Sequence, residues 1–218
     1  AKIDLGMLSS EWTAESSGYD DMEAFVRDKL GDFMGEGKAE IAKKDVVLYG
    51  FGRIGRLLAR RIIQTTGRGE QLRLRAIVLR PKMKDAYEET VKRMSLLEDD
   101  SIHGEFAGSI ITNKSGKEVI INGNRVHIIY AGSPQDIDYT AYGIEDALII
   151  DNTGVWRDKD ALSIHLRPGA SQVLLTAPGK GIPNIVHGVN HHELDQGNHQ
   201  IVSAASCTTN AVVPVIDV

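Results

Sequence analysis

This sequence has little cysteine, no excess of positive charge and no long hydrophobic run. A single cysteine among 218 residues excludes an internal disulfide and a zinc site built from cysteines, so Cys207 is either buried filler or a reactive thiol. With a formal net charge of -5, the chain lacks the excess of positive charge that is typical of proteins binding nucleic acid or an anionic membrane. The expected partners are therefore small molecules or protein subunits, with no nucleic acid and no membrane among them.

Targeting and membrane-spanning signals are missing as well. The first five residues show no basic region followed by an apolar run, and no stretch approaches the roughly 18 apolar residues of a membrane span. The composition, with 42% hydrophobic and 25% charged residues, is that of an ordinary globular protein. We expect a soluble, cytoplasmic protein with one compact domain and a short extension.

The first 44 residues differ from the rest of the chain because they are rich in Ser, Gly, Asp and Glu. Apolar residues at helical spacing predict one short amphipathic helix over residues 20–34, and residues 35–38 predict a break and linker. The favoured interpretation is a helix packed on its own domain; the alternative is an arm that docks on a neighbouring subunit. The apolar residues are Met22, Phe25, Val26, Leu30, Phe33 and Met34.

From residue 45 onward, apolar runs alternate with helical patterns. Residues 45–49, 54–66 and 72–80 form a predicted strand, helix and strand. A helix is predicted over residues 84–97, with Tyr87, Val91, Met94 and Leu97 on its apolar face, and residues 109–131 predict a small antiparallel meander. Strands are also predicted at residues 147–151, 172–176 and 200–203, and a helix at 159–166. This order predicts an α/β fold of the Rossmann type, a doubly wound, mainly parallel sheet with a small antiparallel β insertion.

A glycine-rich turn lies between the first predicted strand and helix of this region. Its glycines match Gly-x-Gly-x-x-Gly, and each glycine serves a physical purpose. Gly50 permits the tight turn, Gly52 lets backbone amides approach a pyrophosphate, and Gly55 allows close packing of helix on strand. The helix N-terminus presents free amides and partial positive charge. The predicted dinucleotide-binding residues here are Gly50, Phe51, Gly52, Arg53, Ile54 and Gly55.

The end of the next predicted strand departs from the usual dinucleotide pattern. An acidic residue for the adenosine ribose is expected there, but Arg80 occupies the tip of the strand. Arginine pairs with a 2′-phosphate and offers no acceptor to ribose hydroxyls. We hypothesise that NADP is tolerated or preferred; the alternative is an exposed Arg80 with NAD held by backbone contacts. The cofactor is therefore NAD or NADP.

Cys207 follows a predicted strand and a short turn, and precedes a predicted helix over residues 208–218. A thiol at a helix N-terminus has its thiolate favoured by the helix dipole and by free amides. The same amides stabilise the oxyanion that forms when a thiolate attacks an aldehyde. This position favours the reactive thiol over buried filler. Ser206 and Thr208 flank the sulfur with hydroxyls suited to binding a phosphate or to orienting the turn.

The segment from Ser203 to Asn210, Ser-Ala-Ala-Ser-Cys-Thr-Thr-Asn, resembles the signature of the phosphorylating glyceraldehyde-3-phosphate dehydrogenase family. The resemblance covers Lys44 to Val218, in order. Supporting segments are residues 50–56, 100–104, 121–124, 152–155, 177–178 and 188–191.

The resemblance implies a role for each matching residue. The backbone of Arg53 and Ile54 would bind the pyrophosphate, and Thr153, Gly154 and Thr176 would line the nicotinamide side. Cys207 would form a hemithioacetal with glyceraldehyde 3-phosphate and then a thioester, which inorganic phosphate cleaves to 1,3-bisphosphoglycerate. Ser206 and Thr208 would hold phosphate. His187, His191 and His192 lie close together in the sequence, as metal ligands often do. We nevertheless expect no metal, because the resemblance implies an enzyme that needs none and in which this stretch is structural.

Residues beyond Val218 would complete the site by this resemblance. The histidine that activates the thiolate and the residues that bind substrate phosphates would lie downstream. We therefore expect an N-terminal fragment with residues 1–44 as an extension, 45–206 as the NAD(P)-binding domain and 207–218 as the start of a catalytic-domain helix. The full-length protein would be a homo-oligomeric enzyme of glycolysis and gluconeogenesis. Alternatives are an erythrose-4-phosphate dehydrogenase and a non-catalytic dinucleotide-binding module in which Cys207 is redox-sensitive or inert.

Overall fold

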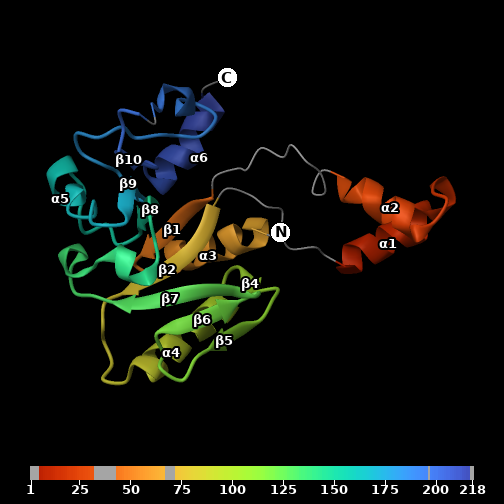
Figure 1. Cartoon of the computed structure of the whole chain (residues 1–218). Helices are drawn as coiled ribbons and strands as arrows, with labels where there is room; N and C mark the ends of the chain where they lie inside the picture. The colour runs from red at the N-terminus through yellow and green to blue at the C-terminus, as the bar shows by residue number, and fades with distance from the viewer. Residues whose placement is uncertain (1–4, 32–42, 67–71, 196, 217–218) are drawn as a thin grey trace. The chain divides into compact units, whose positions relative to one another are not determined.

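The computed structural model describes residues 5–31, 43–66, 72–195 and 197–216 (Figure 1). Two compact units divide the chain, one made mainly of residues up to Lys43 and one made mainly of residues from Lys44. The predicted linker at residues 35–38 lies outside the described residues, as do Phe33 and Met34. None of the helices in the described ranges is long and apolar enough to cross a membrane.

The N-terminal unit holds two helices where the sequence predicts one. Helix α1 spans Leu5–Glu15, a 3-10 turn follows at Ser16–Gly18, and α2 spans Met22–Lys29. Poor helix formers inside α1, Gly6 among them, obscured it in the sequence. Helix α2 is shorter than predicted because Asp21 caps its start, accepting a hydrogen bond of 2.7 Å from the Ala24 N–H, and Gly31 follows its C-cap residue.

Phe25 forms the centre of this unit. Its ring is buried between Trp12, with ring centroids 5.3 Å apart, and Tyr19, at 5.1 Å. Lys29 adds an ion pair of 2.8 Å to Glu15 across the two helices. The apolar face of α2 thus packs inside the N-terminal unit through Phe25, with Val26 and Leu30 half-buried, whereas Met22, predicted to lie on the same face, is 55% exposed.

The second unit is built on an eight-stranded sheet with the order β10-β9-β8-β1-β2-β7-β6-β5, which confirms the predicted Rossmann-type fold. Strands β10, β9, β8, β1, β2 and β7 are parallel, and β6 and β5 continue the sheet in antiparallel pairing. The antiparallel strands thus join the main sheet through β7. The strands are β1 Lys44–Tyr49, β2 Leu72–Leu79, β5 Ile110–Thr112, β6 Glu118–Ile121, β7 Asn124–Tyr130, β8 Ala147–Asp151, β9 Ala170–Leu175 and β10 Ile201–Ser203, with a separate hairpin of β3 Asp99–Asp100 and β4 Gly104–Glu105.

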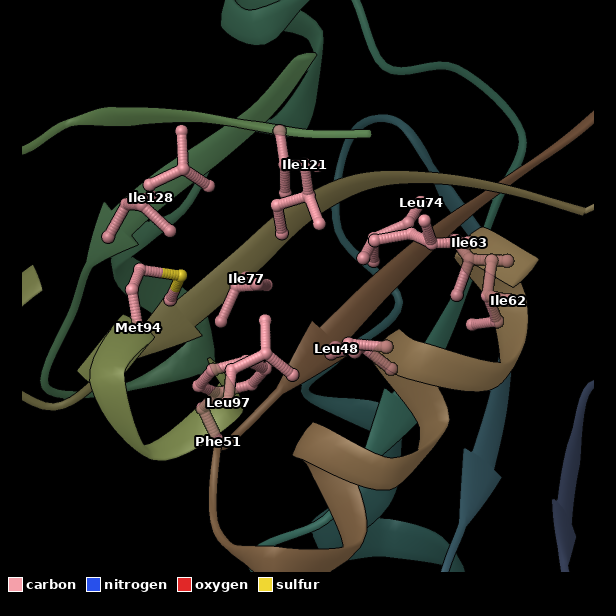
Figure 2. Close-up of a cluster of buried hydrophobic side chains, with 14 of the residues drawn as sticks. Leu48, Phe51, Ile62, Ile63, Leu74, Ile77, Met94, Leu97, Ile121 and Ile128 are labelled. Atoms are coloured by element: carbon pink, nitrogen blue, oxygen red, sulfur yellow. The ribbon is translucent and has the colours of Figure 1, made fainter. Parts of the chain in front are cut away.

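Buried side chains cover both faces of the central strands, as expected for parallel sheets. Val46 and Leu48 of β1 pack in one cluster with side chains from α3, Arg53–Thr66, and α4, Ala86–Glu98 (Figure 2). The alternate residues Val47 and Tyr49 pack in a second cluster on the opposite face. This period-2 division explains why β1 is an almost continuous apolar run.

Helix α4 buries a face that hydrophobic spacing did not predict. Met94 and Leu97 are buried as expected from the sequence, but Tyr87 and Val91 are 44% and 41% exposed. The polar residues Glu89 and Thr90 are buried instead. Polar partners from other segments explain this, because Thr90 Oγ1 donates to the Gly116 carbonyl at 2.6 Å.

The order of the strands positions the candidate site. Strand β1 lies between β2 and β8, so the chain changes direction across the sheet at β1, and open α/β sheets bind ligands at such a switch point. The carboxyl ends of β1, β8, β9 and β10 lie along one edge because these strands are parallel. The segments that follow them begin at Gly50, Asn152, Thr176 and Ala204. Two further helices complete the unit, α5 Lys159–Ser163 and α6 Cys207–Ile216.

Candidate functional site

The three glycines of the turn after β1 meet different surroundings. Gly50 has φ +89°, and a Cβ added there would lie 2.8 Å from Thr153 Cγ2. A Cβ added at Gly55 would lie 2.5 Å from the Gly50 carbonyl oxygen, so α3 starts in contact with the turn. An added Cβ at Gly52 would meet nothing within 4 Å. The turn and the helix leave no room for side chains at Gly50 and Gly55, and the space beside Gly52 is open for a ligand.

Side chains of the residues between the glycines point in different directions. Phe51 is 4% exposed and belongs to the hydrophobic core, so it offers a ligand only its backbone. Arg53 and Ile54 begin α3 with exposed side chains. Their backbone N–H groups lie in the first turn of the helix, where they have no partner within the helix.

A cleft of about 200 Å³ lies at the carboxyl ends of β1 and β2. Arg80, which the sequence singles out, lines this cleft together with Lys82, which sequence reasoning missed. None of the described lining residues carries a carboxylate. The full lining set is Tyr49, Gly50, Val78, Arg80, Lys82, Ala131, Thr153 and Val155. The cleft therefore adjoins the glycine turn and carries two cations at its edge.

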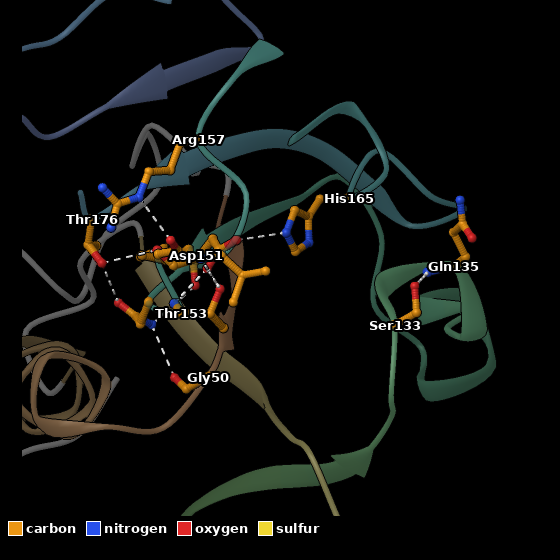
Figure 3. Close-up of polar contacts among 12 residues, drawn as sticks. Gly50, Ser133, Gln135, Asp151, Thr153, Arg157, His165 and Thr176 are labelled. Atoms are coloured by element: carbon orange, nitrogen blue, oxygen red, sulfur yellow. Dashed lines mark hydrogen bonds and ion pairs between the residues drawn. The ribbon is translucent and has the colours of Figure 1, made fainter. Parts of the chain in front are cut away.

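Asn152 connects three strand ends and was not predicted as a site residue. Its Nδ2 donates to the Gly50 carbonyl at 3.3 Å and to the Ile150 carbonyl at 3.1 Å, and its Oδ1 accepts from Thr176 Oγ1 at 3.2 Å (Figure 3). Thr176 Oγ1 also lies 3.0 Å from the Asp151 carbonyl. The Thr176 hydroxyl, predicted to line the nicotinamide side, thus also braces the turn through Asn152.

Asp151 holds the start of the segment that follows β8. Its Oδ1 accepts hydrogen bonds of 2.6 Å from both the backbone N–H and the Oγ1 of Thr153. Gly154 follows with φ +63°, and its carbonyl accepts from Arg157 Nε at 2.9 Å. Thr153 and Gly154 therefore have a defined position beside Gly50.

His165 contacts the second carboxylate oxygen of Asp151, the one that does not bind Thr153. Its Nε2 lies 3.0 Å from Asp151 Oδ2, and both residues are 0% exposed. The imidazole packs edge-on against Tyr49 and Trp156, at centroid distances of 4.7 and 5.2 Å. Burial, with the Asp151 charge as a second cause, raises the pKa of Tyr49 to about 12. No local sequence signal marks this pair, because its members belong to separate elements.

Cys207 is exposed and is the first residue of α6, as the sequence predicts. The turn before it contains Ala205 with φ +58°, a conformation that costs an alanine about 1 kcal/mol or more. Ser203 stabilises the turn: its Oγ accepts from the Ala205 N–H at 2.9 Å and donates to the Ala177 carbonyl at 2.6 Å. The turn redirects the chain from β10 into the helix and presents the thiol at its start.

The two hydroxyls beside the sulfur have different surroundings. Ser206 Oγ accepts from the Thr209 N–H at 2.9 Å and forms a second hydrogen bond of 2.8 Å with Thr209 Oγ1, so it caps α6. Thr208 is exposed. Asn210 Nδ2 donates to the carbonyls of Ala204 and Ser206 at 2.7 and 2.9 Å, which secures the turn. Asn210 was part of the recognised motif, and its role in holding the turn emerges only from the fold.

The histidine-rich stretch has a structural arrangement. His187 and His191 stack with ring centroids 4.7 Å apart, and His191 Nδ1 accepts from the Gly188 N–H at 3.1 Å. Asn190 closes the same loop, accepting from the Val186 N–H at 2.7 Å. Within the part of the chain that the structure describes, no three His, Cys, Asp or Glu side chains gather as metal ligands.

Comparisons with known proteins show which family this chain is similar to. Residues 44–159 match the family model described as glyceraldehyde 3-phosphate dehydrogenase, NAD binding domain. A protein of Pseudomonas aeruginosa named glyceraldehyde-3-phosphate dehydrogenase-like protein is 50% identical over 219 residues, which cover 99% of this chain and 46% of that protein. This match includes the N-terminal unit.

Two plant proteins match a shorter part of the chain. The cytosolic glyceraldehyde-3-phosphate dehydrogenase of Taxus baccata is 35% identical over 81% of this chain and 48% of its own length. The cytosolic enzyme of Mesembryanthemum crystallinum is 35% identical over 82% of this chain and 49% of its own length. The chain spans about half the length of the curated relatives it matches.

Proposed function

The chain belongs to the glyceraldehyde 3-phosphate dehydrogenase family and carries its NAD(P)-binding domain, and we propose that a whole protein containing it oxidises and phosphorylates glyceraldehyde 3-phosphate. The observation that carries this proposal is the common edge of the sheet. The glycine turn follows β1, the Asn152 and Thr176 network follows β8 and β9, and Cys207 begins the helix after β10. A cofactor site and a candidate nucleophile therefore belong to one strand edge.

The residues of the turn fit a dinucleotide in chemistry and in space. The open side of Gly52 admits a pyrophosphate, and the first N–H groups of α3, at Arg53 and Ile54, are donors for its oxygens. We assign the nicotinamide side to Thr153, Gly154 and Thr176, whose positions Asp151 and Asn152 hold. The bound cofactor supplies the hydride acceptor for the oxidation.

Cys207 is the proposed nucleophile of the reaction. Its thiolate sulfur attacks the aldehyde carbon and forms a C–S bond, which gives a hemithioacetal. Loss of a hydride from that carbon leaves a thioester, and inorganic phosphate then attacks the acyl carbon and releases the thiolate. The products are 1,3-bisphosphoglycerate and reduced cofactor. The resemblance implies that the base that takes the thiol proton lies downstream of Val218.

Ser206 and Thr208 have distinct proposed roles in this site. Ser206 Oγ caps α6 by accepting from the Thr209 N–H, and the other first N–H groups of this helix are the proposed donors to a developing oxyanion. Thr208 is exposed beside Cys207 and is available to a substrate phosphate. Family membership also supports a homo-oligomeric state for the whole protein. A cytoplasmic location is supported by the names of the plant relatives.

An assay of the whole protein tests this function. Glyceraldehyde 3-phosphate, inorganic phosphate and NAD or NADP should produce reduced cofactor, followed by absorbance. Cys207→Ser replaces the proposed nucleophile and should abolish turnover. Thr13→Ser is the control, because it changes a hydroxyl-bearing residue of the N-terminal unit, and it should leave turnover intact. Faster turnover of erythrose 4-phosphate would instead assign the alternative substrate. Dinucleotide binding without reduction of either cofactor would assign a binding module.

A further inference from the structure

The loop after β2 carries two cations at the edge of the cofactor cleft. Arg80 and Lys82 are both exposed, and both line the cleft of about 200 Å³ beside Gly50. Pro81 lies between them and restricts the backbone there. A guanidinium and an ammonium are donors only, so neither replaces the carboxylate that accepts hydrogen bonds from ribose hydroxyls.

Glu89 holds this loop through hydrogen bonds to its backbone. It belongs to α4 and is 2% exposed, and its Oε2 accepts from the Lys82 N–H at 2.9 Å and the Met83 N–H at 3.0 Å. Its other oxygen accepts from Arg93 Nη2 at 3.3 Å. Burial alone raises the pKa of Glu89, but the bonds from Lys82, Met83 and Arg93 outweigh that effect and lower it. The carboxylate is therefore charged and committed to the loop.

The charges around Glu89 leave the loop positive. Arg93 pairs with the buried carboxylate, so Glu89 does not neutralise the side chains of Arg80 and Lys82. A neighbouring cavity of about 210 Å³ shares Lys82 with the cofactor cleft, but its other cations, Lys92 and Arg93, do not line that cleft. A ligand group with two negative charges fits the pair Arg80 and Lys82 better than a ribose hydroxyl does.

We propose that Arg80 and Lys82 together bind the 2′-phosphate of NADP, and that Glu89 is the positioning residue that holds Lys82 for this contact. The proposal rests on the proposed binding of a dinucleotide in the cleft beside Gly50. The selectivity comes from the loop after β2, separately from the glycine turn that binds the pyrophosphate.

Calorimetric titration of the 218-residue chain with NADP and with NAD tests the proposal. The unsubstituted chain should bind NADP more tightly than NAD. Arg80→Gln and Lys82→Gln should each weaken NADP binding roughly tenfold and change NAD binding by less than about twofold, the loss expected for one charge-assisted contact. Lys92→Gln is the matched control, because Lys92 lines the neighbouring cavity and not the cofactor cleft; it should leave both affinities unchanged.

The positioning role of Glu89 is tested by the ratio of NADP to NAD affinity, which the loss of a purely structural side chain would not change. Glu89→Ala should lower the ratio of NADP to NAD affinity roughly tenfold while NAD still binds. Glu89→Gln keeps an acceptor oxygen for the Lys82 and Met83 N–H groups and should restore most of the ratio. This conservative variant also serves as the test if Glu89→Ala fails to fold.

Several results would overturn the proposal. Equal binding of NAD and NADP by the unsubstituted chain, or equal losses of both in the Arg80 and Lys82 variants, would remove the phosphate site. A loss of NADP affinity in Lys92→Gln as large as in Lys82→Gln would place the phosphate in the neighbouring cavity. An unchanged affinity ratio in both Glu89 variants would remove its positioning role. Failure to bind either dinucleotide would instead contradict the proposed function.

Discussion

Asp151 and His165 form a pair inside the protein, with His165 Nε2 3.0 Å from Asp151 Oδ2 and both residues 0% exposed. His165 Nδ1 is also buried and has no hydrogen-bond partner among the described residues. We infer from this arrangement that the Nε2–H of His165 donates to Asp151 Oδ2, while the other oxygen of Asp151 holds Thr153.

The first prediction concerns this pair. His165→Phe keeps an aromatic ring but removes the donor, so Asp151 Oδ2 becomes a buried acceptor without its partner. We expect the free energy of unfolding to fall by about 3 kcal/mol, measured by urea denaturation. His127→Phe is the control, because His127 is partly buried and its ring packs on Tyr142 at 5.4 Å; its cost should stay below about 1 kcal/mol. Similar losses in the two variants would contradict a special role for the pair.

The glycine turn yields a second prediction, because its glycines differ in surroundings. Gly55→Ala should destabilise the protein by about 2 kcal/mol, since the new methyl would meet the Gly50 carbonyl oxygen at 2.5 Å. Gly52→Ala should leave stability almost unchanged but weaken NAD binding roughly tenfold, because its methyl would enter the space assigned to the pyrophosphate. Thermal unfolding and calorimetric titration measure the two effects. Unchanged NAD affinity in a folded Gly52→Ala protein would place the pyrophosphate elsewhere.

Acid stability provides a third prediction, centred on Asp100. The N–H groups of Ile102 and His103, with the Arg56 guanidinium, lower the pKa of Asp100 to about 2. Because the folded pKa lies below the unfolded value of about 4, the ionised carboxylate stabilises the fold above pH 4 and this contribution is lost as the pH falls toward 2. The stability difference between the unsubstituted protein and Asp100→Asn should therefore shrink between about pH 4 and pH 2. A difference that stays constant across urea titrations in this range would refute the assignment.

The turn before the nucleophile gives a fourth prediction. Ala205 has φ +58°, so Ala205→Gly should change the free energy of unfolding by less than about 1 kcal/mol, whereas the β-branched Ala205→Val should cost about 2 kcal/mol. Alkylation by iodoacetamide reports on Cys207 alone, because the chain has no other cysteine. The valine variant should alter this rate and the glycine variant should preserve it. Equal rates in all three proteins would show that the turn does not control the thiol.

Local patterns in the sequence determined much of the second unit. The apolar run of β1, the glycines before α3 and the start of α6 at Cys207 all follow from interactions between near neighbours in the chain, which explains why periodicity and turn chemistry found them. The length of α2 was predicted less well, because its start depends on the cap residue Asp21 and its end on the C-cap residue Leu30 and on Gly31. Helix α1 has weak local propensity and left no clear pattern.

Only the tertiary structure decided which distant side chains meet. Asn152 contacts the Gly50 carbonyl across 102 residues of sequence, and that contact exists because β8 and β1 are neighbours in the sheet. The burial of Glu89 against the loop after β2 likewise depends on how α4 packs. Hydrophobic periodicity cannot reveal a polar side chain that is buried together with its hydrogen-bond partners. The sequence by itself determined the local turn and the thiol position, whereas strand order and helix packing supplied the polar contacts that hold them, since those contacts join residues that no local pattern connects.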